Sequence, residues 1–434
     1  MSEQLSIICF RISSQIWSAF TLALISFASF GQGLGNSPYS TFGIGEMLSG
    51  TTAAQQMMGG SGVSYTNGLF INNLNPALLA RNRVTTLEVG GMLQVKQMQD
   101  ILNKQKVTGG NLSYLSMAFP LNSRWTASFN YAPYSFLDYK ITTYSEIAGS
   151  SYYALMTNNG TGASNKISLS TGYRLYKNLY VGVTGSYLFG TTTREQSSQT
   201  VGMNDGYDYQ IVISDIDRMS NPVFKAGASY RFKLAEKRYL NVGGTYDLPA
   251  RINGKRVQSY AEFIGDTPVT NSSDTLSYNK RVHMNLPGGF RAGLSFENPY
   301  RLAISADVAY QQWSKFRDFD RDSQGFRDTY QFNLGLEYTP NVMSSSNYFS
   351  RIPYRFGINY TQLPYNLTNR RINEASITFG VGLPLNKVGL SDANLGFTVG
   401  QRGRIESSVF KEQFFRVTLG FTISDQWFYR QVVD

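Results

Sequence analysis

Residues 415–423, FRVTLGFTI, show the pattern that decides the fold. Every second residue is apolar or aromatic, and the residues between them are Arg, Thr and Gly. Successive side chains of a β-strand point to opposite faces, so this stretch predicts a strand with one apolar and one polar face. The same alternation occurs in residues 377–383, ITFGVGL, and 394–400, NLGFTVG.

The alternation recurs from Arg83 to the end of the chain without a helical interlude. A soluble β-sandwich would show the same alternation, but this series is longer than one sandwich usually is. Segments of about ten residues or more are long enough to cross a bilayer at a tilt. We therefore predict an all-β fold, a transmembrane antiparallel β-barrel of about 14 strands. Candidate strands start near Arg83, Val107, Arg124, Ser164, Asn178, Val223, Arg238, Tyr278, Tyr300, Phe326, Tyr354, Ile372, Gly389 and Gln413.

The ends of the candidate strands and their connections support a membrane barrel. Apolar faces often end in aromatic residues, as an interfacial girdle requires; these are Tyr131, Tyr187, Tyr310, Trp313 and Trp427. Short connections at 120–123, 176–177, 298–299 and 385–387 contrast with long polar loops predicted at 148–162, 197–221, 254–279 and 317–325. Pro133 and Pro249 interrupt alternating runs, which predicts bulges or local gaps in the wall, because proline removes a ladder donor.

Composition excludes several classes of function. The net charge is +10, but Lys and Arg are scattered singly over predicted loops and strand ends, so we expect no nucleic-acid partner. Outer-membrane lipid and lipopolysaccharide are the expected surroundings of such a barrel. Cys9 and His283 are the only cysteine and histidine, so disulfides, Cys- or His-based metal sites and a catalytic Ser–His pair are not expected. We expect no cofactor and no enzymatic activity.

The N-terminal 82 residues differ from the strand series. An apolar run at 12–30 follows Arg11, and the small residues Ser29 and Gly31 precede a cut ahead of Gln32, which predicts a cleaved signal peptide over 1–31. Residues 57–80, MMGGSGVSYTNGLFINNLNPALLA, have neither helix nor strand periodicity. A barrel of about fourteen strands is too wide to fill with its own side chains. We therefore predict an N-terminal extension and plug over 32–82, inside a barrel formed by 83–434.

Within this segment, residues 59–80 resemble the N-terminal hatch of the FadL/OmpP1/TodX transporters of hydrophobic compounds. Gly59, Gly60 and Gly62 correspond to the glycine repeats of the hatch, and Asn75, Pro76 and Ala77 match its Asn-Pro-Ala motif. Three later strings are similar to strands of this family: LPGGFRAGLSF (286–296), ADVAYQQWSKF (306–316) and IPYRFGINYTQLPY (352–365).

The resemblance implies passive uptake of hydrophobic small molecules or lipids, such as long-chain fatty acids, across the outer membrane. In this family the ligand leaves sideways through a gap in the barrel wall, and Pro133 in the third candidate strand is our choice for the kink. Residues 36–47, NSPYSTFGIGEM, resemble instead a variant found in Bacteroidota outer membranes, some members of which serve as accessory subunits of larger assemblies. A structural subunit with outer-membrane protein partners therefore stays open beside the transporter, as does an adhesin that binds through its loops.

Overall fold

A computed structural model describes residues 35–101, 103–150, 152–201, 209–265, 267–269, 273–319, 325–367, 370–385, 391–406 and 409–425. The predicted signal peptide over 1–31, with Cys9, lies outside these ranges, as does Trp427. None of the helices in the described part is long and apolar enough to span a membrane.

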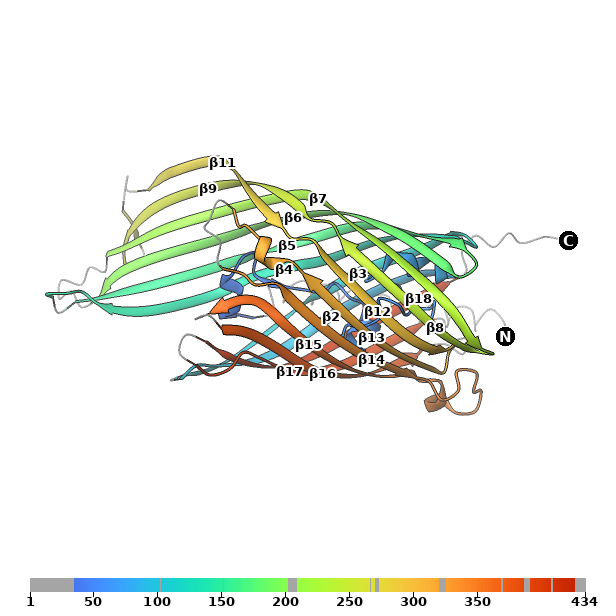
Figure 1. Cartoon of the computed structure of the whole chain (residues 1–434). Helices are drawn as coiled ribbons and strands as arrows, with labels where there is room; N and C mark the ends of the chain where they lie inside the picture. Colours follow the sequence, from blue (N-terminus) through green and yellow to red (C-terminus); the bar gives the residue numbers. More distant parts are fainter. Residues whose placement is uncertain are drawn as a thin grey trace, which may run out of the picture.

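The described chain forms one antiparallel sheet that closes on itself between its last and first long strands, β18 and β2 (Figure 1). The long strands are β2 (Thr85–Gln99), β3 (Lys104–Asn122), β4 (Trp125–Glu146), β5 (Tyr153–Tyr176), β6 (Leu179–Val201), β7 (Tyr209–Ala235), β8 (Arg238–Asp247), β9 (Ala250–Ile264), β11 (Asp274–Leu286), β12 (Gly289–Asn298), β13 (Leu302–Gln311), β14 (Thr329–Tyr338), β15 (Tyr354–Leu367), β16 (Arg370–Pro384), β17 (Asp392–Arg402) and β18 (Lys411–Asp425). Two short pieces, β1 (Glu46–Met47) and β10 (Thr267–Pro268), pair with β4 and β9.

The barrel has 14 strands, as the sequence predicts. β8 and β9 are two parts of one wall strand, separated at Pro249, and β12 and β11 are likewise separated at Pro287 and Gly288. The register shows this directly: β7 pairs with β8 through one half of its length and with β9 through the other. Proline cannot donate to the ladder, which accounts for a break at each position. The two breaks lie side by side in the wall, because β9 pairs with β11 and β8 pairs with β12.

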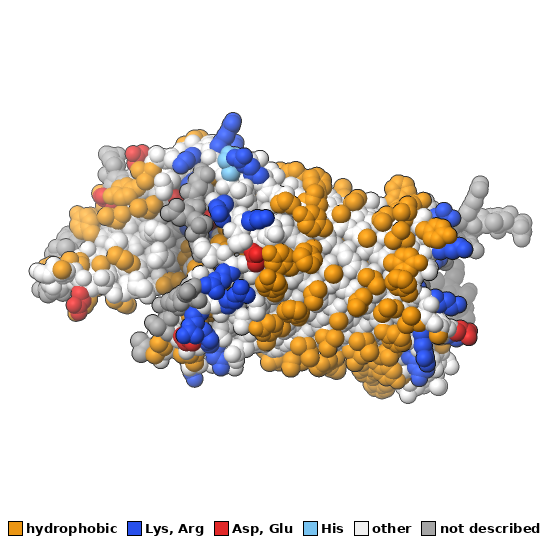
Figure 2. All heavy atoms as spheres, in the orientation of Figure 1, with side chains coloured by type: hydrophobic (Ala, Val, Ile, Leu, Met, Phe, Trp, Pro, Cys, Tyr) orange, Lys and Arg blue, Asp and Glu red, His pale blue; other side chains and the backbone are white. Residues whose placement is uncertain are grey.

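The outer face of the barrel is an apolar belt (Figure 2). Phe415, Phe421 and Ile423 of β18 are about two-fifths exposed, whereas Thr418 and Thr422 between them are buried toward the lumen. This is the alternation of the opening stretch, with the apolar residues turned outward. An apolar exterior and a polar interior are the reverse of a soluble protein and define a transmembrane barrel.

Strand length divides the barrel into two ends. The turns between β3 and β4, β5 and β6, and β7 and β8 are tight and lie at the right-hand end of the barrel in Figure 1. Strands β5, β6 and β7 have 24, 23 and 27 residues, whereas β13 and β14 have only 10, and the extra length projects from the other end. A crossing needs about 9–11 residues, so β5–β7 extend well beyond the membrane, at the end that faces outside in barrels of this type.

This extension corrects three predicted loops. Residues 148–162, 197–221 and 254–279 contain mostly strand, whereas 317–325 is a loop where it is described. Above the membrane both faces of a strand are wet, so polar residues on both faces do not indicate a loop there.

Candidate functional site: the barrel lumen and a gap in its wall

Residues 49–82, which we call the inner segment, lie inside the barrel. The segment contains α2 (Ala53–Met57) and η2 (Pro76–Arg81) and is largely buried. It packs on inward-facing glycines of ten strands, where an added Cβ would lie within 3 Å of it: Gly172, Gly182, Gly227, Gly243, Gly293, Gly335, Gly357, Gly380, Gly396 and Gly420. At Gly357 a Cβ would lie 2.1 Å from the Gly59 nitrogen. This glycine ring lets the inner segment lie directly on the wall around most of the circumference.

The predicted hatch glycines lie where the inner segment meets β12 to β16. Gly59 donates its amide to Thr378 Oγ1 at 3.0 Å, and its φ of +67° is in the region that favours glycine. The Gly62 amide donates to Asp307 Oδ2 at 2.8 Å. The carbonyl of Gly60 accepts from Arg291 Nη1 at 3.1 Å. Polar side chains of the wall thus form the hydrogen bonds that this irregular backbone cannot form within itself.

The predicted Asn-Pro-Ala motif starts η2. Asn75 Oδ1 accepts from the Ala77 amide at 3.0 Å and caps this short helix, and Pro76 takes a first-turn position, where no amide is needed. Asn75 Nδ2 donates to the carbonyls of Val63 and Ala228, at 2.7 and 3.1 Å. The motif therefore joins two parts of the inner segment to β7. Whether the segment moves as a hatch stays a prediction.

The barrel wall has a gap between β3 and β4. In the described chain these strands pair only over 115–122 and 125–131. Beyond Tyr131, β4 continues beside β5 to Glu146 but is no longer paired with β3. Pro133 lies at the start of the gap, beside a β-bulge in the β4–β5 ladder. The structure thus places Pro133 at a wall discontinuity; its part in a lateral exit stays a prediction.

Residues 35–48, which we call the strap, fill the gap. β1 pairs with β4 at Ser135 and Phe136, and the amides of Ser37 and Leu48 donate to the carbonyls of Asp138 and Tyr134, both at 2.9 Å. On the other side Gly35 lies against Val107 and Thr108 of β3. The strap therefore takes the place of β3 as the neighbour of β4.

A buried group of charges ties the strap to β2, β16, β17 and β18, on the β3 side of the gap. Glu46 accepts from Arg402 Nη2 at 2.8 Å and from Lys96 Nζ at 3.2 Å. Ser37 Oγ donates to Glu412 Oε1 at 2.6 Å. Arg402 also pairs with Glu374, at 2.6 Å, and with Glu412, at 3.4 Å. Together with Arg416, whose Nη2 is 3.8 Å from Glu46, the group has three cations and three carboxylates and is neutral only while the strap is in place.

An apolar cluster lies in the lumen toward the outer end. Tyr39 and Ile44 of the strap join aromatic residues of the loop after β13, and Trp313 and Phe316 of that loop are in ring contact at 5.1 Å. Trp313 is only 2% exposed, so its predicted place in the interfacial girdle is wrong. The loop folds inward and turns this side chain into the lumen. The other described buried members include Leu188, Met219, Ile252, Val282, Met284, Leu286, Phe319, Phe326, Tyr365, Ile372 and Val409.

A cavity of about 460 Å³ lies between this cluster and the inner segment. Gly50, Gln56 and Gly60 line it on one side, and Trp313 and Tyr365 of the cluster line it on another. Pro133, at the start of the wall gap, also lines it. Glu46, Met47 and Leu48 of the strap line it too, so cavity, strap and gap are adjacent.

Solved structures with a similar fold include two toluene transporters. A Pseudomonas aeruginosa FadL homologue superposes with a TM-score of 0.58 at 12% identity, the Ralstonia pickettii toluene transporter TbuX with 0.56 at 14%, and the P. putida toluene transporter TodX with 0.55 at 16%. Each comparison covers 87% of this chain and 99% of the other. The chain is thus an outer-membrane β-barrel with the FadL-type fold, as its sequence motifs predict.

A family model places the chain more narrowly. The model described as BamG matches residues 14–434, and the chain belongs to the BamG family. A search of curated protein sequences found no match.

Proposed function

We propose that the chain is a passive outer-membrane channel for hydrophobic small molecules, with long-chain fatty acids as the substrate class. The observation that carries the proposal is the gap between β3 and β4, which lies next to a lumen cavity and is filled by the strap. Proteins of similar fold include toluene transporters, which pass a hydrophobic small molecule.

The proposed path follows from the distribution of apolar surface. A ligand enters from outside through the apolar cluster. Contact with the cluster removes the ligand's apolar surface from water, which is favourable. The inner segment, held by the glycine ring and by polar anchors such as Asp307, blocks the way along the barrel axis. A sideways exit at Pro133 leads directly into the bilayer, so the ligand does not have to pass the inner segment.

Filling the cavity tests the proposal. Ser168 is 5% exposed and lines the cavity, whereas its neighbour Leu169 is 66% exposed on the outer face. We expect Ser168→Trp to abolish copurification of hydrophobic ligands in lipid extracts analysed by mass spectrometry. Leu169→Trp, which changes the lipid-facing surface, should leave the ligands in place. Equal ligand content in the two variants would contradict the proposal.

One observation favours a second candidate, a structural subunit of a larger outer-membrane assembly. The strap is held by buried ion pairs, which make the closed wall rigid. For such a subunit we expect stoichiometric outer-membrane partners on gentle purification, and no effect of Ser168→Trp on the cells. Ligand in the extract, lost in Ser168→Trp, would favour the channel instead.

A further inference from the structure

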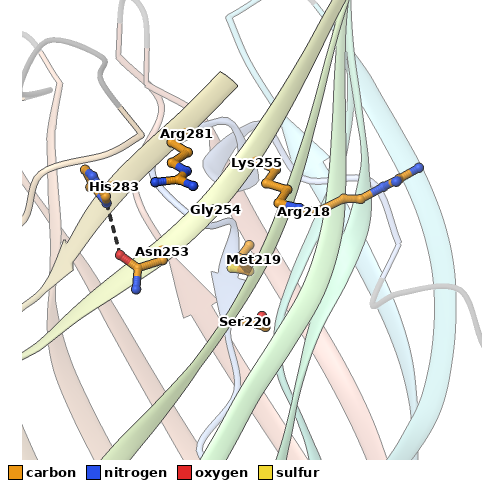
Figure 3. A pocket seen from close by; sticks show the side chains of 8 residues that line it. All are labelled: Arg218, Met219, Ser220, Asn253, Gly254, Lys255, Arg281 and His283. Carbon is orange, nitrogen blue, oxygen red and sulfur yellow. Dashed lines mark hydrogen bonds between the residues drawn. The ribbon is translucent and has the colours of Figure 1, made fainter. Parts of the chain in front are cut away.

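A second cavity, of about 580 Å³, lies away from the lumen site, on the part of the wall formed by β7, β9 and β11 (Figure 3). Arg218, Lys255 and Arg281 line it, one from each strand. All three are exposed, and the residues that alternate with them, such as Met219 and Val282, are buried in the lumen cluster. The three cations therefore face outward.

The strand register places these cations in one row. Arg218 pairs directly with Lys255, and Lys255 pairs directly with Arg281. Like charges directly opposite each other on neighbouring strands destabilise a sheet. No described carboxylate lies within ion-pair distance of any of the three. Within the described part of the chain, the row is a positive site without a paired carboxylate.

The next row toward the membrane carries hydrogen-bonding groups. Ser220 and Asn253 line the cavity beside His283, whose Nδ1 is 3.1 Å from Asn253 Oδ1. Figure 3 shows His283 and Asn253 joined in this way beside Arg281. The site thus offers three cations and a set of neutral polar groups that suit an anion with attached hydroxyl groups.

The membrane level fixes what this site faces. Phe224, Tyr246 and Phe290, each at least half exposed, mark the outer edge of the apolar belt on β7, β8 and β12. Arg218 lies six residues beyond Phe224 on β7, roughly 20 Å along the strand and roughly 15 Å along the barrel axis at the usual tilt. In Figure 2 basic side chains gather beside the pale-blue histidine at this edge of the belt. The row therefore faces the head-group and sugar layer of the outer leaflet.

We infer that this cavity binds a phosphate group of an outer-leaflet glycolipid, whose acyl chains lie against the apolar belt below. The guanidinium forks of Arg218 and Arg281 match phosphate oxygens, and Lys255 supplies a point charge between them. A bound phosphate removes the repulsion along the row. The belt begins roughly 15 Å below the site along the barrel axis. A glycolipid that spans this distance gains both contacts, whereas a free phosphate gains only one.

The test uses the purified full chain in detergent with bisphosphorylated lipid A as the probe. The variant is Arg218→Gln/Lys255→Gln/Arg281→Gln. The matched control, Lys104→Gln/Lys106→Gln/Lys140→Gln, removes three exposed cations from β3 and β4. We expect the variant to lose roughly a hundredfold in affinity, since each cation near a charged membrane surface contributes about a factor of five. The control should bind as the unaltered chain does.

Two further arms identify the ligand and check the fold. Dephosphorylated lipid A should bind the unaltered chain as weakly as bisphosphorylated lipid A binds the variant, and inorganic phosphate should compete only at far higher concentration. Without lipid and at low salt, the variant should unfold at the same or a higher temperature, because the repulsion is gone. Undiminished binding of lipid A by the variant would overturn the inference, as would inorganic phosphate binding as tightly as the lipid, or a lower unfolding temperature of the variant.

Discussion

Glu46→Gln tests how the strap is held. The substitution keeps the shape of the side chain but removes one of three buried negative charges, which leaves Arg402 and Lys96 with one partner fewer. Breaking a buried ion pair costs about 3–5 kcal/mol. The amide of Gln retains one acceptor oxygen, so we take the lower end. A loss of about 3 kcal/mol in strap docking corresponds to a rise of roughly a hundredfold in the open fraction.

Hydrogen exchange read by mass spectrometry measures that fraction. In the strap the amides of Ser37 and Leu48 are bonded to β4, and their exchange should accelerate by the same factor. Glu297→Gln is the matched control, because Glu297 is equally buried and pairs with Arg81 of η2, at 2.9 Å. It should loosen η2 and leave the strap unchanged. Unaltered strap protection in Glu46→Gln would refute the role given to the ion pairs.

Two other predictions concern the fit of the lumen and its response to pH. Gly357→Ala places a methyl group against the Gly59 backbone and should lower the stability of the barrel in urea by about 1–3 kcal/mol. In Gly185→Ala the added methyl group meets nothing closer than 3.6 Å, so this substitution should be near neutral. Equal effects of the two substitutions would contradict the role of the glycine ring. Burial alone would raise the pKa of the Glu46 carboxyl, but Arg402 and neighbouring cations outweigh burial and hold that pKa well below its usual range. A carboxylate whose pKa is lowered by folding stabilises the folded state at every pH above its unfolded pKa, and this stabilisation is lost as pH falls through the folded pKa. Strap protection, corrected for intrinsic exchange, should therefore be constant from pH 8 to pH 5. A loss near pH 6 would contradict this.

The strand series is predictable from sequence because its signals are local. Starts expected near Arg124, Asn178 and Arg238 agree within one residue with strands that begin at Trp125, Leu179 and Arg238. Each follows a tight turn, where polar and flexible residues interrupt the alternation. Alternation also predicts the strand count, because the breaks at Pro249 and Pro287 are too short for the chain to reverse direction there. Each broken strand therefore counts as one strand of the wall.

The inner segment is predictable in part, and the strap is not. Asn75 caps a short helix that begins at Pro76, a local relation that the sequence displays. Strap residues have distant partners: Glu46 is 50 residues from Lys96 and 356 from Arg402. The sequence of 36–47 has no periodicity from which its place beside β4, in the position of β3, could be predicted. The wall glycines that face the inner segment could have been noticed, because they recur on the polar face of successive strands.

Trapping the strap in place tests the central claim most directly. Met47 and Ser135 are opposite each other between β1 and β4, so Met47→Cys/Ser135→Cys can form a disulfide there. Thr142→Cys/Thr157→Cys, between β4 and β5, is the control. The Oγ1 atoms of these two threonines are 3.4 Å apart, and the pair does not involve the strap. The measurement is uptake of a labelled long-chain fatty acid by cells that carry each variant. Oxidation should lower uptake at least tenfold in the strap variant alone, and reductant should restore it. Undiminished uptake with the strap disulfide formed would contradict passage through the gap between β3 and β4.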